Sequence, residues 1–378
     1  NQASQLLALT AREFGPAWLP LPLLLAAAGF IEMYRRRRTS FWFFALIVVA
    51  DLAYSLNYEI AEDKGAYYLP AFMSIAVATG FGVKMFGSFA SRKWPQLDLR
   101  LTGPIALAVI VLTTTVAGNY SYSNRHNFYL ASDYVSNIEK PIERGGMLLT
   151  TDWQVYSPLL YLREIEQQRR DIIAIDINLL RRSWYFDYLR SQYPELMSSS
   201  HNAVETFLTD LRRWEQDPEL FARTPNLARQ INDHFHQMIE SLIASHLREA
   251  PVYVTWEVGV GMAEDAELSQ KLNQDYRLVP EGLVFRLGTD QNFTRAADPE
   301  LETRGLNDGS FSFTADDVVM QKILPAYTSM MINRGKYLEV LGQPAQAAGA
   351  YRRALTLDAR SVIAQQSLQR LERNQAGK

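Results

Sequence analysis

Apolar residues are concentrated at the start of the chain, where they form four continuous stretches separated by short polar segments. Each stretch has about 17 to 24 residues, which at about 1.5 Å per helical residue is enough to cross a hydrocarbon core of roughly 30 Å. We therefore predict four transmembrane helices, at about residues 17–34, 40–57, 67–90 and 101–117. Buried helices of a large soluble protein are the alternative, but four such runs in succession are rare in soluble folds.

Loop charges predict the orientation of these helices. The loop after the first helix is the run Arg35–Arg38, and the loop after the third contains Arg92, Lys93 and Arg100. Basic loops stay in the cytoplasm, so we place both there. The loop at residues 58–66 has three acids and one lysine and is expected outside. The first 118 residues thus form the transmembrane region, and we expect an integral protein of a bacterial inner membrane whose C-terminal domain is periplasmic.

After residue 118 the pattern changes to short apolar strands that alternate with helices. Alternation of this kind indicates a soluble α/β domain with a partly parallel sheet, which we place at residues 119–312 outside the cytoplasm. Residues 290–312 are rich in Asn, Asp and Gly and predict a loop. The predicted strands are 147–151, 171–177, 252–256 and 283–287, and the predicted helices are 120–143, 155–168, 185–193, 205–214 and 227–248.

The tail at residues 313–378 has the residue spacing of a tetratricopeptide unit. Small and aromatic residues fall where two helices of that repeat approach each other: Gly335, Ala347, Tyr351 and Ala354. One unit is predicted at about residues 327–359, followed by a capping helix at 360–373. A single unit cannot bury its apolar face alone, so it must pack on the α/β domain or on a partner. An ordinary helical hairpin is the alternative.

Composition narrows the function classes. The first 118 residues hold ten basic and seven acidic residues out of 38 and 41 in the chain, so the remainder is acidic. An acidic soluble part argues against nucleic acid as a partner. The chain has no cysteine, which excludes disulfides, thiolate metal sites and cysteine nucleophiles. It begins without Met or a signal-peptide pattern, and we expect it to be the C-terminal part of a longer protein.

The predicted outer loop at residues 58–70 carries the first candidate site. Its acids and tyrosines are Glu59, Glu62, Asp63, Tyr67 and Tyr68. Carboxylates at a membrane surface can bind a divalent metal that holds a phosphate, or polarise a hydroxyl group. Tyrosine rings can stack on the face of a sugar. A solvated acidic loop with interfacial aromatic residues is the alternative.

Two further candidates follow the first two predicted strands, at the strand ends where α/β proteins bind ligands. They are Asp152, Trp153 and Tyr156 after the first strand, and Arg181, Arg182 and Trp184 after the second. A helix beginning near Asp152 would favour an anion, although Asp152 could equally be an N-cap. Paired arginines beside aromatic rings can grip a phosphate or a carboxylate, or form a plain salt-bridged turn.

The remaining charged residues and histidines provide no further strong candidate for a functional site. Asp51 and Lys84 lie inside predicted membrane helices, where charges are usually paired or functional, although Lys84 can extend to the cytoplasmic interface. His234 and His236 are two positions apart on a predicted helix and point apart, so we expect no metal site there.

Residues 148–166, together with Arg170-Asp171, Asn178-Leu179-Leu180 and Trp184-Tyr185, resemble a bacterial family of multipass membrane proteins long labelled as a domain of unknown function. That family is similar to the animal endoplasmic-reticulum protein O-mannosyltransferases of the plexin-modifying type. The resemblance covers roughly residues 1–200, and Tyr67–Pro70 shares it. Many members carry Asn-Gly-Asp-Asn-Asp where this chain has Thr151–Val155, so one acid is retained.

The resemblance implies a GT-C-like glycosyltransferase that uses a polyprenyl-phosphate-linked sugar on the extracytoplasmic face. Its catalytic carboxylate is expected in the first outer loop of the full protein, which precedes this chain. Our first hypothesis is therefore the C-terminal part of such an enzyme, with the lipid bilayer, the lipid-linked donor and a protein acceptor as partners. The alternative is a non-enzymatic, membrane-anchored envelope scaffold that binds a partner through its soluble and tetratricopeptide-like domains.

Overall fold

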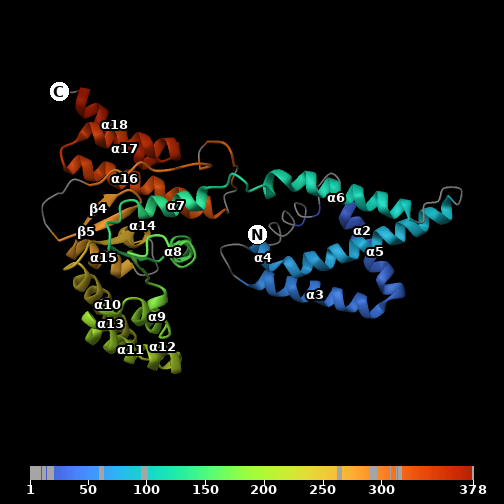
Figure 1. The fold of residues 1–378 in the computed structure, drawn as a ribbon, viewed down its shortest axis with the longest axis horizontal. Coiled ribbons are helices and arrows are strands. Elements are labelled where there is room, and N and C mark those ends of the chain that lie inside the picture. Colours follow the sequence, from blue (N-terminus) through green and yellow to red (C-terminus); the bar gives the residue numbers. More distant parts are fainter. Residues whose placement is uncertain are drawn as a thin grey trace. The chain divides into compact units, whose positions relative to one another are not determined.

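The computed structural model describes residues 10, 14, 21–58, 64–94, 101–261, 266–289, 296–306, 308–311, 313 and 317–376. The chain divides into two compact units, Asn1–Asn127 and Phe128–Lys378 (Figure 1). The first unit holds the long apolar helices, and the second holds a mixed sheet with helices around it.

The first unit is helical throughout its described elements. These are α2 (Leu21–Arg36), α3 (Arg38–Asn57), α4 (Lys64–Tyr67), α5 (Leu69–Lys93) and α6 (Thr102–Ser123). Three of them, α3, α5 and α6 up to Tyr120, are long and apolar enough to cross a membrane. The chain therefore has the helices of a membrane protein. Because α2 is described over only 16 residues, the fourth span stays a prediction.

Close contact between α2 and α5 depends on glycine. A Cβ atom at Gly29 would lie 1.7 Å from the carbonyl oxygen of Ala78, and one at Gly82 would lie 1.9 Å from that of Leu25. Helices inside membranes pack through small residues in this way. Lipid tails are as apolar as the side chains, so the helices associate by close packing and not by the hydrophobic effect. By contrast, the apolar stretch of α3 is only 6% buried within the described residues, and that of α6 is not buried there at all. Both helices therefore have apolar surface that lipid can cover.

The intramembrane acid predicted to need a partner has one. Asp51 of α3 accepts a hydrogen bond of 3.1 Å from the backbone N–H of Ala71. That N–H belongs to the first turn of α5, whose free donors carry a partial positive charge. Asp51 therefore has a structural partner at a helix start. Lys84 is exposed on the surface of the unit.

The second unit is built on a five-stranded sheet in the order β2-β1-β3-β5-β4. The strands are β1 (Met147–Thr150), β2 (Ile173–Asp176), β3 (Val252–Thr255), β4 (Arg277–Glu281) and β5 (Val284–Gly288). Strands β2, β1 and β3 are parallel, whereas β5 and β4 are antiparallel to their neighbours. The predicted partly parallel sheet is therefore present, with β4 as a strand that the sequence pattern did not reveal.

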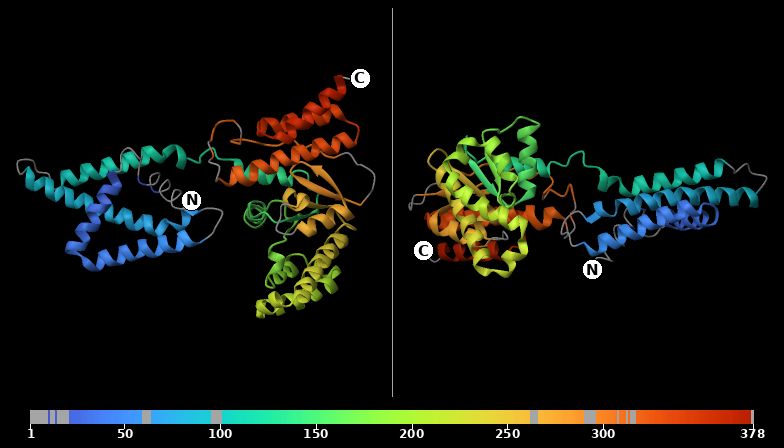
Figure 2. Two further views of the ribbon diagram at one scale, coloured as in Figure 1. Left: turned by 180° about the vertical axis from the view of Figure 1, so that it is seen from behind. Right: turned by 90° about the horizontal axis from the view of Figure 1, so that it is seen from below.

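Two groups of helices flank this sheet, α9–α13 on one side and α16–α18 on the other (Figures 1 and 2). Prolines begin several of them, where the missing N–H has no helical partner to lose. The helices are α7 (Leu130–Glu139), α8 (Trp153–Glu164), η1 (Leu179–Arg181), α9 (Tyr185–Gln192), α10 (Pro194–Ser199), α11 (His201–Gln216), α12 (Pro218–Arg223), α13 (Pro225–His246), α14 (Trp256–Val260), α15 (Ala266–Asp275), η2 (Val319–Ile323), α16 (Leu324–Val340), α17 (Pro344–Leu357) and α18 (Val362–Ala376).

The structure corrects several of the elements expected from the sequence. The helix predicted at 120–143 is two helices, because α6 ends at Ser123 and α7 begins at Leu130. The Asn124 side chain accepts a hydrogen bond from the backbone N–H of His126, a local bond that competes with helical pairing. The strand predicted at 252–256 ends at Thr255, since the next residue opens α14. Helices α10, α12, α14 and α15 were not predicted.

Helices α16 and α17 form a closely packed pair in the tail. A Cβ atom at Gly335 would lie 2.5 Å from the ring of Tyr351, so the aromatic side chain fills the space that glycine leaves. Arg334 donates to the carbonyl oxygen of Pro280 at 3.3 Å, and α16 thereby packs on β4. The tail thus packs on the α/β region, whereas its tetratricopeptide assignment stays a prediction.

Candidate functional site

The order of the parallel strands marks one place where a ligand would be expected to bind. The sheet starts at β1, adds β2 on one side, and then adds β3 on the other side of β1. In open α/β sheets, ligands bind outside the carboxyl ends of the strands at the place where the order reverses in this way. Here that place lies between the segments that follow β1 and β3.

Both strands end in the same local pattern, a threonine followed two residues later by an acid. The pairs are Thr150 with Asp152 and Thr255 with Glu257. The Thr255 hydroxyl donates to the Thr150 hydroxyl at 3.3 Å, and the N–H of Asp152 donates to the same oxygen at 3.0 Å. These bonds tie the two strand ends together and bring the two acids to one side of the sheet.

Asp152 is buried, with 3% of its surface exposed. One carboxylate oxygen accepts a 3.1 Å hydrogen bond from the N–H of Gln154, so Asp152 is the N-cap of α8. The other oxygen accepts from the Tyr134 hydroxyl at 3.4 Å. The capping role considered for Asp152 is thus present, and its second oxygen faces α7.

Glu257 is the most unusual side chain of this group. Both of its carboxylate oxygens are buried without a well-formed hydrogen bond from the residues that the structure describes, although the backbone N–H of Glu257 and the Thr255 side chain lie close enough to stabilise its charged form. Burial and the negative charge of Asp152 raise the pKa of Glu257 to about 7, against the lowering effects of its own backbone N–H, the Thr255 side chain and Lys322. A buried polar group without a partner costs free energy, so a bound ligand would relieve that cost.

Two further side chains complete the site. The pKa of Tyr134 lies well above its ordinary value because of burial and then because of Glu257 and Asp152, so its hydroxyl stays a proton donor. Lys322 of η2 donates to the Gln154 side-chain oxygen at 3.3 Å. A carboxyl group that titrates near neutral pH beside a second carboxylate can both donate and accept hydrogen bonds. The arrangement suits a ligand with several hydroxyl groups.

A metal ion does not fit this group. Among the residues that the structure describes, no three or more His, Asp and Glu side chains are arranged to hold one. The third strand-end acid, Asp176 of β2, accepts from the N–H groups of Asn178 and Leu179 at 2.8 and 3.2 Å. Burial raises the pKa of Asp176 despite these donors. We therefore treat it as a support for the turn after β2.

The residues predicted after the first two strands divide into exposed and buried sets. Trp153 and Trp184 are 54% and 59% exposed. Tyr156 is buried, and its hydroxyl lies 2.7 Å from that of Tyr185. The Arg181 guanidinium lies 4.0 Å from the centre of the Phe235 ring. Arg182 is exposed.

The residues predicted in the outer loop belong to the first unit. Tyr67 is partly exposed and lies 5.8 Å from Tyr58, measured between ring centres. Tyr68 is 1% exposed and packs inside the helical unit. The three predicted acids Glu59, Glu62 and Asp63 lie outside the described residues.

Sequence reasoning missed Glu257, Tyr134 and Lys322. A signal for the first was present, because Thr255-Trp256-Glu257 repeats the pattern Thr150-Thr151-Asp152 at the end of an apolar strand. No signal marked the other two, since they reach the site from segments that lie before β1 and after β5.

The chain was compared with known proteins at the level of sequence and of structure. Comparisons with models of protein families, with characterised proteins and with solved structures find no match. A functional conclusion therefore depends on the chemistry of the residues at the ends of β1 and β3 and on the apolar helices of the first unit.

Proposed function

We propose that this chain is the C-terminal, membrane-anchored part of a GT-C-like glycosyltransferase that uses a polyprenyl-phosphate-linked sugar on the extracytoplasmic face. In this proposal its second unit binds the hydroxyl-rich part of a substrate at Asp152 and Glu257. The observation that carries the proposal is the buried Glu257 carboxylate, which has no well-formed hydrogen bond among the described residues and has its pKa raised by burial and by Asp152 at the strand-order reversal.

Carbohydrate chemistry matches the groups at this place. Carboxylate oxygens accept hydrogen bonds from sugar hydroxyls, and the half-protonated Glu257 can also donate one near pH 7. The exposed ring of Trp153 adjoins Asp152 and offers a flat apolar face to a sugar ring. In this proposal these residues bind the substrate, and the catalytic acid is not among them. The three apolar helices support a substrate carried on a lipid.

The test is sugar transfer by the full-length parent protein in membranes, from labelled polyprenyl-phosphate donors. We expect Glu257→Gln and Asp152→Asn to raise KM and to lower kcat/KM at least about tenfold each, because each change removes hydrogen bonds to a charged group. Glu300→Gln is the matched control, since that glutamate is exposed. Unchanged transfer in both site variants would remove the site from the mechanism. If the folded and membrane-inserted protein transfers no sugar from any donor, the glycosyltransferase proposal is refuted.

One observation favours the non-enzymatic scaffold as a second candidate. Val362 and Ile363 in the first turn of α18 are 59% and 54% exposed, side by side on the tail. Adjacent exposed apolar residues favour contact with a protein partner. A scaffold predicts that Val362→Ser with Ile363→Ser abolishes partner recovery from crosslinked membranes, while Glu257→Gln leaves it unchanged. The enzyme predicts that Glu257→Gln lowers transfer whatever the tail variant does.

A further inference from the structure

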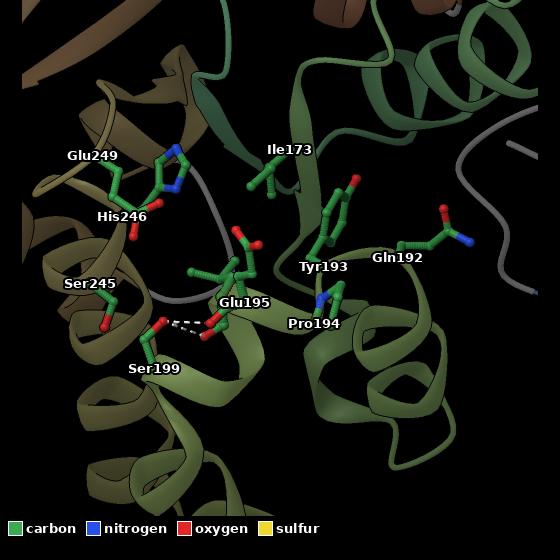
Figure 3. Close-up of a pocket in the computed structure, with 10 residues that line it drawn as sticks. Ile173, Gln192, Tyr193, Pro194, Glu195, Ser199, Ser245, His246 and Glu249 are labelled. Atoms are coloured by element: carbon green, nitrogen blue, oxygen red, sulfur yellow. Dashed lines mark hydrogen bonds between the residues drawn. The ribbon is translucent and has the colours of Figure 1, made fainter.

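A cavity lies at the amino ends of the parallel strands β1 and β2. It has a volume of about 290 Å³ and is lined by residues of α9, α10, α13 and the start of β2 (Figure 3). Ile173 is the first residue of β2, and His246 binds the carbonyl oxygen of Gly145, just before β1. Since Asp152 and Glu257 follow the carboxyl ends of the strands, this cavity is separate from the site above.

His246 presents a hydrogen-bond acceptor to this cavity. The side chain is 6% exposed, and its Nε2 atom lies 2.9 Å from the Gly145 carbonyl oxygen. A carbonyl oxygen only accepts, so Nε2 carries the proton and donates. In the neutral ring, Nδ1 then holds a lone pair. Nδ1 has no hydrogen-bond partner among the residues that the structure describes, although the side chain is more than nine-tenths buried.

Two carboxylates share the cavity with His246. Glu195 of α10 and Glu249 after α13 both line it, and Figure 3 shows the Glu195 carboxylate between His246 and Tyr193. Neither glutamate forms an ion pair or a side-chain hydrogen bond with any residue in the described part of the chain. No Lys or Arg is among the described residues that line the cavity. The cavity is therefore a negative one.

Arg163, which contacts the lining residues Gln192 and Tyr193, is already engaged. Arg163 donates to the Tyr193 hydroxyl and to the Gln192 side-chain oxygen, behind the cavity wall. It also forms an ion pair of 3.0 Å with Glu164. Its charge is therefore partly balanced, and it does not neutralise Glu195 or Glu249 directly.

The charge and chemistry of the lining favour an organic cation over a metal ion. No group of His, Asp and Glu side chains in the described residues is compact enough for a metal ion, whereas a primary ammonium offers three N–H donors on one nitrogen. Ile173, Leu196 and the Tyr193 ring supply apolar wall for a short stem. We propose that this cavity binds a primary ammonium group on a short aliphatic stem, with Glu195, Glu249 and Nδ1 of His246 as its acceptors.

Two sources could provide such a group, a small free amine and a lysine side chain of a protein. The test uses the full chain in phosphatidylcholine nanodiscs, with ¹³Cε1–¹H signals of its five histidines recorded by NMR. The His246 signal is assigned with His246→Gln. The probes are n-pentylammonium for the free amine and Nα-acetyl-lysine methylamide for the lysine side chain. The Nε-acetylated lysine derivative is the uncharged control.

We expect saturable movement of the His246 signal with a Kd of about 1 mM for a charged probe and none for the acetylated control. Glu195→Gln with Glu249→Gln should weaken binding at least about tenfold. Glu219→Gln, an exposed change on α12, should leave it unchanged. Binding of n-pentylammonium alone assigns free amines, and binding of both probes admits a lysine side chain. A silent His246 signal, equal binding by the double variant with the other histidine signals intact, or tighter binding of Ca²⁺ would overturn the proposal.

Discussion

Replacing Glu257 with glutamine should change how the stability of the second unit depends on pH. The pKa of Glu257 is raised from 4.5 to about 7, mainly by burial. A carboxyl group with a raised pKa in the folded state stabilises the fold fully below pH 4.5, and this contribution is lost as pH rises through about 7. At roughly 1.4 kcal/mol per pKa unit, the gap amounts to about 3 kcal/mol. Glutamine keeps the shape and removes the charge.

The assay is urea unfolding of the full chain in nanodiscs at pH 5 and pH 8, followed by tryptophan fluorescence and near-ultraviolet circular dichroism. We expect Glu257→Gln to be more stable than wild type at pH 8, by up to about 3 kcal/mol, and close to wild type at pH 5. Glu300→Gln provides the exposed control. Equal pH dependence in Glu257→Gln and wild type would refute the reasoning, because it would mean that burial does not penalise this charge.

Three other substitutions test the packing. Gly335→Ala should destabilise the tail by about 1–3 kcal/mol through contact with an aromatic ring of α17, seen as faster amide exchange in α16, whereas Gly349→Ala meets open space and should not. Gly82→Ala should lower the thermal midpoint of the first unit, and Gly80→Ala, with open space around it, should leave it unchanged; equal midpoints would contradict the α2–α5 contact. Asp152→Ala should cost about 0.5–2 kcal/mol in urea unfolding by removing the α8 N-cap, and no loss would exclude that role.

Elements with a strong local pattern were predictable from the sequence. The apolar helices and the strands β1, β2, β3 and β5 each stand out as mainly hydrophobic runs with turn residues around them. Strand β4 did not, because Arg277, Pro280 and Glu281 interrupt its apolar residues. An edge strand tolerates such residues, since one side of its backbone needs no partner strand. Helix α12 is six residues long and too short to show a helical repeat of apolar residues, although Asp217 and Pro218 mark its start.

The candidate site was predictable only in part. Asp152 could be singled out because a polar run follows an apolar strand, a feature of local sequence. The importance of Glu257 comes from its burial, and burial is produced by segments far away in the chain, including η2 with Lys322 and α7 with Tyr134. Its pKa depends on those distant neighbours. Local sequence patterns contain no information about them.

The hydroxyl of Tyr185, which contacts the Tyr156 hydroxyl, also accepts a hydrogen bond from the outer edge of strand β2. In the parallel pairing, Ile173 and Ile177 direct their N–H groups toward β1, so those of Ala174 and Asp176 point away from the sheet. The hydroxyls of Tyr193 and Tyr185 accept hydrogen bonds from these two outward N–H groups, at 3.2 and 3.3 Å. At the far edge, α16 covers β4. Both margins of the sheet are thus closed to an incoming strand, which protects a protein crowded in a membrane from joining its neighbours into β-aggregates.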